Sequence, residues 1–231
     1  MRLVFKAVIS AAILYCGFAV PAAADEPAKP SLWSFGVTAG TLGAGVEASA
    51  RVYDNVVFRV NGSYVKLDSS WVLSASSLAK DYNLDVAGIF AGGILDYHPF
   101  SSGWRLSAGA RYVDIDLQGV AKNGMSLGGV SYTADQVGNV TATVRNGNPV
   151  APYLGFGYDS SHFSTDGSGF KLGFDIGAMY IGEPDVSITT ARTPASPTFT
   201  SDVSSAATSI KDSLRNYPFY PVAMLSARFS F

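Results

Sequence analysis

Charged side chains recur at alternate positions in several segments whose other residues are mostly apolar or small. Nine of these charges share one expected polar face, and six of the nine are basic: Glu47, Arg51, Arg59, Asp96, Arg105, Arg111, Lys171, Asp175 and Arg228. Successive side chains of a β-strand point to opposite faces, so strands of this kind would direct all nine charges to one side of a sheet. Inside a closed sheet, pairs such as Arg111 with Asp175 would form either a salt-bridged plug or a narrow charged path for small zwitterions.

Other residues predict no enzyme, metal site or cofactor site. Residues 162–164 (His-Phe-Ser) have the spacing of a lipid A deacylase, but they fall in an expected short turn, away from the outer leaflet where that chemistry takes place. The two histidines, His98 and His162, are far apart and have no cysteine partner, so we expect no metal site. No helix follows the glycine-rich residues 40–45 to hold a phosphate, and residues 166–169 lack the ligand spacing of a calcium loop.

The elements that would position the charges are best defined at the end of the chain. Residues 218–231 alternate between apolar side chains, such as Leu225 and Phe229, and polar ones, such as Ser226 and Arg228, and they end on Phe231. One apolar and one polar face with a terminal phenylalanine are typical of the closing strand of an outer-membrane β-barrel. An amphipathic strand of a soluble sheet is the alternative interpretation.

Eight segments with this alternation are expected to form an all-β, eight-stranded, antiparallel, up-and-down transmembrane barrel. They cover residues 33–40, 44–52, 56–66, 81–98, 104–112, 151–159, 170–181 and 218–231. Three short turns (53–55, 99–103 and 159–169) alternate with longer loops (68–80, 118–149 and 184–217). Short periplasmic turns with longer extracellular loops are typical of these barrels, and an even strand number places both termini in the periplasm.

Smaller features complete this prediction. The apolar phase changes after Tyr112, which indicates a bulge or a strand leaving the membrane. Residues 118–149 are expected to contain a partly ordered hairpin, residues 184–200 a proline-rich loop, and residues 202–216 a short amphipathic helix. Leu172 is expected on the lipid-facing side, near the middle of the membrane.

The first 24 residues predict export. Arg2 and Lys6 precede an apolar run and a small-residue cleavage site at 22–24, so residues 1–24 are expected to be a signal peptide and residues 25–231 the barrel domain. The only cysteine, Cys16, would leave with the signal peptide. No later apolar run reaches the roughly 20 residues of a spanning helix. The net charge of −2 gives no indication of nucleic-acid binding.

Three stretches resemble CarO-type outer-membrane proteins. They are APYLGFGY at 151–158, GFDIGAMYIGEPDV at 173–186, and YPV at 220–222 after the expected helix. The resemblance implies an eight-stranded barrel in the outer membrane and passive uptake of small solutes, including basic amino acids and carbapenems. It implies no binding residues, because no substrate-site motif can be matched.

Two functions therefore remain open. The first is a small-solute porin in contact with outer-membrane lipid and small polar solutes. The second is a non-conducting barrel that supports the membrane or presents its outer loops to a partner. In both cases the barrel-assembly machinery is an expected partner, through the closing strand that ends in Phe231.

Overall fold

The structure is a computed structural model that describes residues 31–67, 82–121, 125–127, 130–163, 169–194 and 196–231. The expected signal peptide (1–24), the expected loop at 68–80 and Ser164 lie outside the described residues. None of the helices among the described residues is long and apolar enough to cross a membrane.

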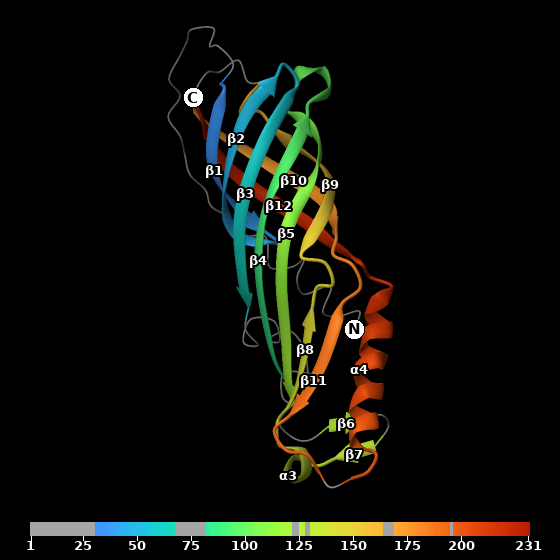
Figure 1. The fold of residues 1–231 in the computed structure, drawn as a ribbon. Helices are drawn as coiled ribbons and strands as arrows, with labels where there is room; N and C mark the ends of the chain where they lie inside the picture. The colour runs from blue at the N-terminus through green and yellow to red at the C-terminus, as the bar shows by residue number, and fades with distance from the viewer. Residues whose placement is uncertain (1–30, 68–81, 122–124, 128–129, 164–168, 195) are drawn as a thin grey trace.

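Eight antiparallel strands close into a barrel, which confirms the expected fold (Figure 1). β12 pairs with β1, where Phe229 lies opposite Phe35, and β5 pairs directly with β9, so the sheet has no open edge within the barrel. The barrel strands are β1 (Trp33–Gly40), β2 (Gly43–Tyr53), β3 (Val56–Leu67), β4 (Tyr82–Tyr97), β5 (Trp104–Ala121), β9 (Val150–Asp159), β10 (Gly169–Tyr180) and β12 (Phe219–Ser230).

The two ends of the barrel differ. The turn end, at the top of Figure 1, carries the β2–β3 turn, the 3-10 helix η2 (Pro99–Ser101), the β9–β10 connection and the C-terminus. The loop end carries the β1–β2 turn, the end of β3, the start of β4, and the described parts of the connections from β5 to β9 and from β10 to β12. Gly43 allows the tight β1–β2 turn, because its φ of 82° lies in the left-handed region that L side chains rarely adopt.

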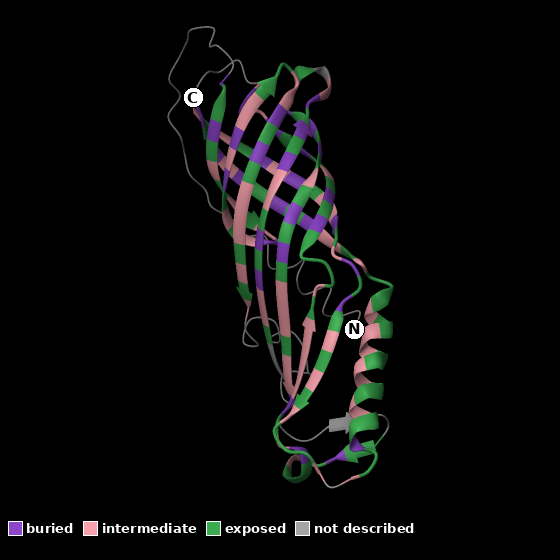
Figure 2. Ribbon diagram, viewed as in Figure 1, coloured by how far each residue is buried: buried purple, intermediate pink, exposed green. Residues whose placement is uncertain are grey.

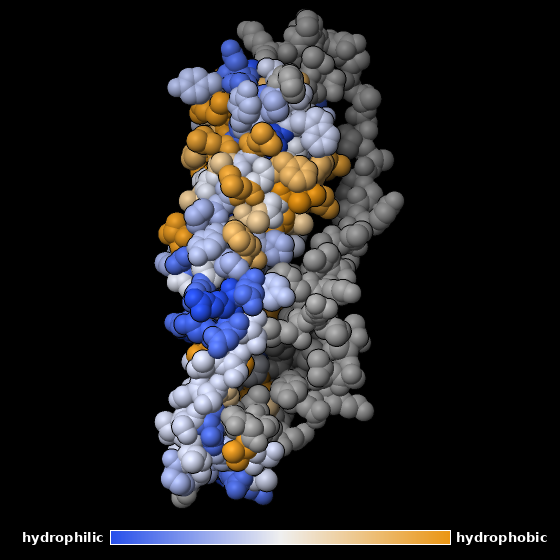
Figure 3. Space-filling view, turned by 90° about the vertical axis from the view of Figure 1, so that its right-hand side faces the viewer, coloured by the Kyte–Doolittle hydropathy of each residue, from blue (hydrophilic) through white to orange (hydrophobic). Residues whose placement is uncertain are grey.

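Side chains alternate between a buried inner face and an exposed outer face along the barrel strands, as Figure 2 shows. The outer face is apolar, and Figure 3 shows its hydrophobic residues gathered on the upper, barrel half of the molecule. Leu172 lies on this face with 76% of its surface exposed. Its expected depth was wrong, because it lies one outer-facing position from Phe170 of the turn end and four from Tyr180 of the loop end.

β5 continues past Tyr112 without a change of phase. Its pairing with β4 is unbroken from Leu106 to Ala121, so the expected bulge is wrong. Val113 lies on the same inner face as Arg111 and is 1% exposed. The apparent phase change arises because the inner face itself becomes apolar at this level.

A sheet extension continues from the loop end. β8 (Val140–Arg145) pairs with the last residues of β5, and β11 (Asp185–Thr190) pairs with β8. The expected loop at 184–200 was therefore wrong in part, because the alternating Asp-Val-Ser-Ile-Thr-Thr run forms a strand. β6 (Met125–Leu127) and β7 (Val130–Tyr132) form the hairpin expected within 118–149.

A second hydrophobic core holds the extension together. The amphipathic helix α4 (Phe199–Arg215) matches the helix expected at 202–216 and packs against β11 (Figure 1). Phe199 contacts Tyr132 edge to face at 5.3 Å, and the Tyr132 hydroxyl donates to Asp202 at 2.6 Å. Val137 of the short helix α3 (Ala134–Val137) and Val140 complete this core.

Candidate functional site

The inner faces of the barrel strands converge on eight charged side chains, which we call the charged layer. None of the eight is more than 5% exposed, and they are four arginines and four carboxylates: Arg59, Arg105, Arg111, Arg228, Glu47, Asp96, Asp159 and Asp175. An eight-stranded barrel is just wide enough for side chains to fill its interior. Because the chain alternates strictly on β2 to β5, β9, β10 and β12, each of these strands delivers at least one charge to the same space.

Arg59 lies at the centre of the layer. Its guanidinium donates to Glu47 Oε2 at 2.9 Å and to Asp175 Oδ2 at 2.5 Å. It also donates to Asp96 Oδ1 at 2.9 Å, while its Nε lies 2.8 Å from Asp96 Oδ2. Arg59 of β3 therefore ties together β2, β4 and β10.

Arg105 and Arg228 close these contacts into a ring. Arg105 donates to Asp175 at 2.6 Å and to Asp159 at 3.1 Å. Arg228 forms an ion pair with Asp159 and donates from Nε to Glu47 Oε1 at 2.5 Å. The ring runs through six side chains of alternating charge, each from a different strand, in the order Glu47, Arg59, Asp175, Arg105, Asp159, Arg228 and back to Glu47.

This arrangement satisfies the physical requirement for charges buried away from water. Removing an ion from water costs several kcal/mol, and only close pairing with charge-assisted hydrogen bonds offsets that penalty. Every member of the ring has two oppositely charged neighbours. The ring therefore braces the barrel across its interior.

Arg111 differs from the other three arginines. Within the described part of the chain it has no carboxylate partner at ion-pair distance; it donates to Asn61 Oδ1 at 2.5 Å and lies 4.8 Å from the ring centre of Tyr153. The expected pair of Arg111 with Asp175 was therefore wrong. A cavity of about 10 Å³ adjoins Arg111, Asn61 and Asp175, which is space for about one water molecule.

Two of the nine expected inward charges lie outside this layer, and one member was missed. Arg51 is at the turn end, where it donates to the carbonyl oxygens of Tyr53 and Asp54. Lys171 is half-buried on the inner face of β10, two residues nearer the turn end than Gly173. The sequence prediction missed Asp159, although it lies on β9 at an even number of positions from the inward-facing Tyr153 and so points to the same face. The expected basic excess was wrong for the charged layer, which holds equal numbers of both signs.

An apolar layer fills the barrel between the charged layer and the loop end. Its buried members come from five strands and the β1–β2 turn: Leu42, Phe90, Ile94, Val113, Ala151, Tyr153, Met179, Val222 and Met224. Tyr153 lies so close to Gly155 and Gly177 that neither position has room for a Cβ. The sequence signal for this layer was the apparent phase change after Tyr112.

Histidines and serines close the turn end. His162 Nδ1 lies 2.7 Å from the Ser31 carbonyl oxygen, and since a carbonyl only accepts, Nδ1 carries the proton and Nε2 accepts from Ser49 at 2.8 Å. Ser49 also contacts Ser34 at 2.6 Å. The serine in contact with His162 is thus Ser49, on the inner face of β2. Among the described residues, no group of three or more His, Cys, Asp and Glu side chains is arranged to hold a metal ion.

Acid is expected to destabilise the turn end. Burial lowers the pKa of His98 from 6.5 to about 4, and it also lowers the pKa of His162. The unfolded chain then binds a proton that folded His98 does not, so the free energy of unfolding should fall as the pH drops from 6.5 towards 4. Urea unfolding in detergent, followed by tryptophan fluorescence at several pH values, would measure this loss. His98→Gln should reduce it; an equal loss in both proteins would contradict the role of His98.

Comparisons with known proteins agree with this geometry. No protein-family model matches the sequence, and no curated protein matches it. Among solved structures, CarO of Acinetobacter baumannii superimposes with a TM-score of 0.59 at 19% identity, over 87% of this chain and 98% of CarO. This chain has the CarO fold. CarO2 of the same organism gives a TM-score of 0.58 at 20% identity, over 88% of this chain and 99% of CarO2. This chain thus shares its eight-stranded barrel fold with both proteins.

Proposed function

We propose that this protein is an outer-membrane uptake barrel of the CarO type, closed at rest, through which small zwitterionic solutes pass when the charged layer rearranges. The observation that carries the proposal is the charged layer itself, which holds equal numbers of arginines and carboxylates inside the barrel. A zwitterion carries one positive and one negative group. It can therefore pair with a carboxylate and an arginine of the charged layer and replace the ion pair between them as it passes. Arg111 supports this route, since it is the arginine whose hydrogen bond goes to an amide, that of Asn61.

The outer face supports a position in the outer membrane. On β5, Trp104 and Tyr112 flank the outward-facing residues Leu106, Ala108 and Ala110. The segment from Trp104 to Tyr112 has nine residues, which is the length of a membrane-spanning strand. The exposed fractions of Trp104 and Leu106 are 54% and 57%. We extend the proposal to the lipid of this membrane as a partner, and to the barrel-assembly machinery as a partner of β12.

Flux through the protein is expected to be slow and intermittent. Liposomes containing the purified protein should swell in glycine or arginine faster than empty liposomes, while planar bilayers should show rare, small channel events and no steady current. The double variant Glu47→Gln with Arg228→Gln removes two adjacent charges of the ring, and the three ion pairs that they form, at constant net charge. It should increase flux and shift ion selectivity. Asp116→Asn, in an exposed pair with Arg145 outside the barrel, is the matched control and should leave flux unchanged. Folded protein that produces neither swelling nor channel events would end the uptake proposal.

The second candidate is a non-conducting barrel that presents the loop-end extension at the cell surface. The specific observation in its favour is the packing of both interior layers, in which Arg59, Arg228, Phe90 and Ile94 are each 1% exposed. In that case the double variant would lower stability and leave flux at the level of empty liposomes.

A further inference from the structure

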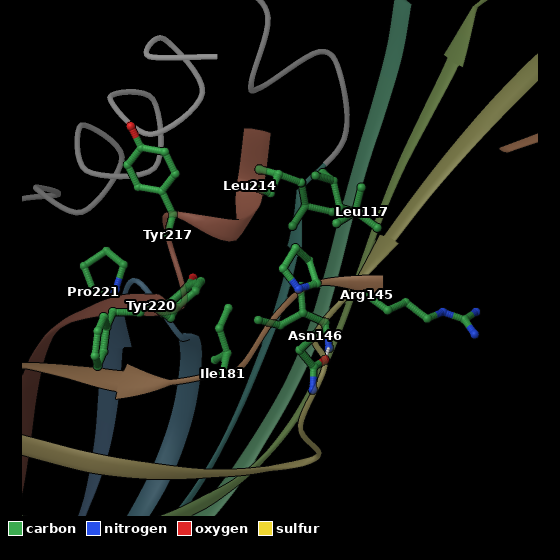
Figure 4. Close-up of a pocket in the computed structure, with 13 residues that line it drawn as sticks. Leu117, Arg145, Asn146, Ile181, Leu214, Tyr217, Tyr220 and Pro221 are labelled. Carbon is green, nitrogen blue, oxygen red and sulfur yellow. Dashed lines mark hydrogen bonds between the residues drawn. The ribbon is translucent and has the colours of Figure 1, made fainter. Parts of the chain in front are cut away.

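A cavity of about 200 Å³ lies at the loop end, between the barrel mouth and the sheet extension (Figure 4). Its walls come from the inner face of β5, the residue after β10, the end of α4 and the start of β12. The residues that matter for the argument are Ile115, Leu117, Ile181, Leu214, Tyr217 and Tyr220. We call this cavity the loop-end pocket.

The polar residues of the loop-end pocket are engaged elsewhere. Arg145 donates to Asp116 at 2.9 Å and points away from the pocket in Figure 4. The Asn146 side chain accepts from the Ile115 N–H at 2.8 Å and donates to the Val113 carbonyl at 2.9 Å. The surface offered to a ligand is therefore almost entirely apolar, without a charge aimed into it.

The pocket is also preformed. The Tyr220 hydroxyl donates to the Thr41 carbonyl at 2.7 Å, and its ring lies 5.9 Å from that of Phe90 in the apolar layer. Asn146 fixes the turn between β8 and β9 through its hydrogen bonds to Val113 and Asn148. A ligand would thus meet walls that are already ordered, which lowers the entropic penalty of binding.

We propose that the loop-end pocket binds a small uncharged aromatic solute, about the size of one ring. An apolar cavity of about 150 Å³ is large enough for benzene in another protein, so the volume here suits a single ring. Tyr220 provides a ring beside the pocket, and aromatic pairs gain free energy beyond that of the buried area. The site does not depend on the uptake proposal, because the apolar layer separates it from the charged layer.

Phenol is the probe for this site, with cyclohexanol as the aliphatic comparison. The protein would be placed in phosphatidylcholine nanodiscs with isotope-labelled isoleucine and leucine methyl groups and titrated by NMR. We expect saturable shifts at Ile115, Ile181 and Leu214, with only a linear drift at Ile89 and Leu172 on the lipid face. Cyclohexanol should bind about 2- to 10-fold more weakly, which is the usual range for aromatic contacts.

Two variants and a measurement with spin-labelled lipid complete the test. Leu214→Trp should fill the pocket and abolish the saturable shifts, whereas Ser213→Trp, at the adjacent exposed position of α4, should leave them. Unchanged methyl signals from the barrel would show that both variants fold. Equal drift at all methyl groups would mean partition into the bilayer and would overturn the proposal. Equal affinity for cyclohexanol would overturn the aromatic assignment. Broadening of the pocket methyl signals by a spin-labelled lipid before phenol is added would show an acyl chain in the pocket and would also overturn it.

Discussion

Replacing Asp175 by asparagine is expected to lower the free energy of unfolding by about 3–5 kcal/mol, because it breaks buried ion pairs and leaves an uncompensated charge. Asp175 accepts from Arg59 at 2.5 Å and from Arg105 at 2.6 Å, and it is 4% exposed. The charged layer would change from electrical balance to an excess of one buried positive charge. Reversible folding into detergent or lipid, titrated with urea, would measure the loss.

The control for Asp175→Asn is Asp116→Asn, which removes the same charge from an exposed ion pair. Asp116 lies 2.9 Å from Arg145, whose side chain is 64% exposed, so water can solvate the arginine that remains. This substitution should change stability by about 0–1 kcal/mol. Similar effects of the two substitutions would show that water reaches the charged layer, and the closed interior would then be wrong.

Replacing Leu154 by arginine is expected to lower the free energy of unfolding by about 2–4 kcal/mol, as a charge does at the middle of a bilayer. Leu154 is 70% exposed on the outer face of β9, and it lies opposite Ala108, midway between Trp104 and Tyr112 on β5. An arginine there must either remain in hydrocarbon or bend its side chain towards a distant interface. The same folding titration into lipid would measure the change.

Val150→Arg is the matched control, since Val150 lies on the same face of the same strand. Its partner on β5 is Tyr112, at the loop-end boundary of the apolar belt, and it is 58% exposed. Near an interface an arginine costs about 0–1 kcal/mol. If Val150→Arg were as destabilising as Leu154→Arg, the membrane would lie nearer the loop end than the aromatic residues indicate.

The ring of ion pairs gives the barrel its rigidity in a way that an apolar filling would not. Four of the six pairs in the ring join strands that are not neighbours in the sheet, such as β3 with β10 through Arg59 and Asp175. A solute that opens one pair still leaves each partner with a second ion pair. The same network can therefore hold the barrel closed at rest and exchange partners locally, which is what the uptake proposal requires.

Most of the barrel could be predicted from the sequence because it depends on local alternation. The period of two assigned Arg59, Arg105, Asp175 and Arg228 to the inner face without knowledge of the neighbouring strands. The number of strands and the positions of the short turns followed from the same period. The helix at 199–215 was also visible, because its apolar residues recur at helical spacing.

The pairing of charges was decided by the tertiary structure alone. Which arginine meets which carboxylate depends on the register between strands that are distant in the chain, and Arg111 was therefore assigned to the wrong partner. The extension at the loop end was likewise missed in part, since β11 is a strand only because β8 offers it an edge. Alternation along one strand thus determined the face of each side chain, whereas its height and partner inside the barrel depend on strand register and tilt, which are set by contacts across the closed sheet.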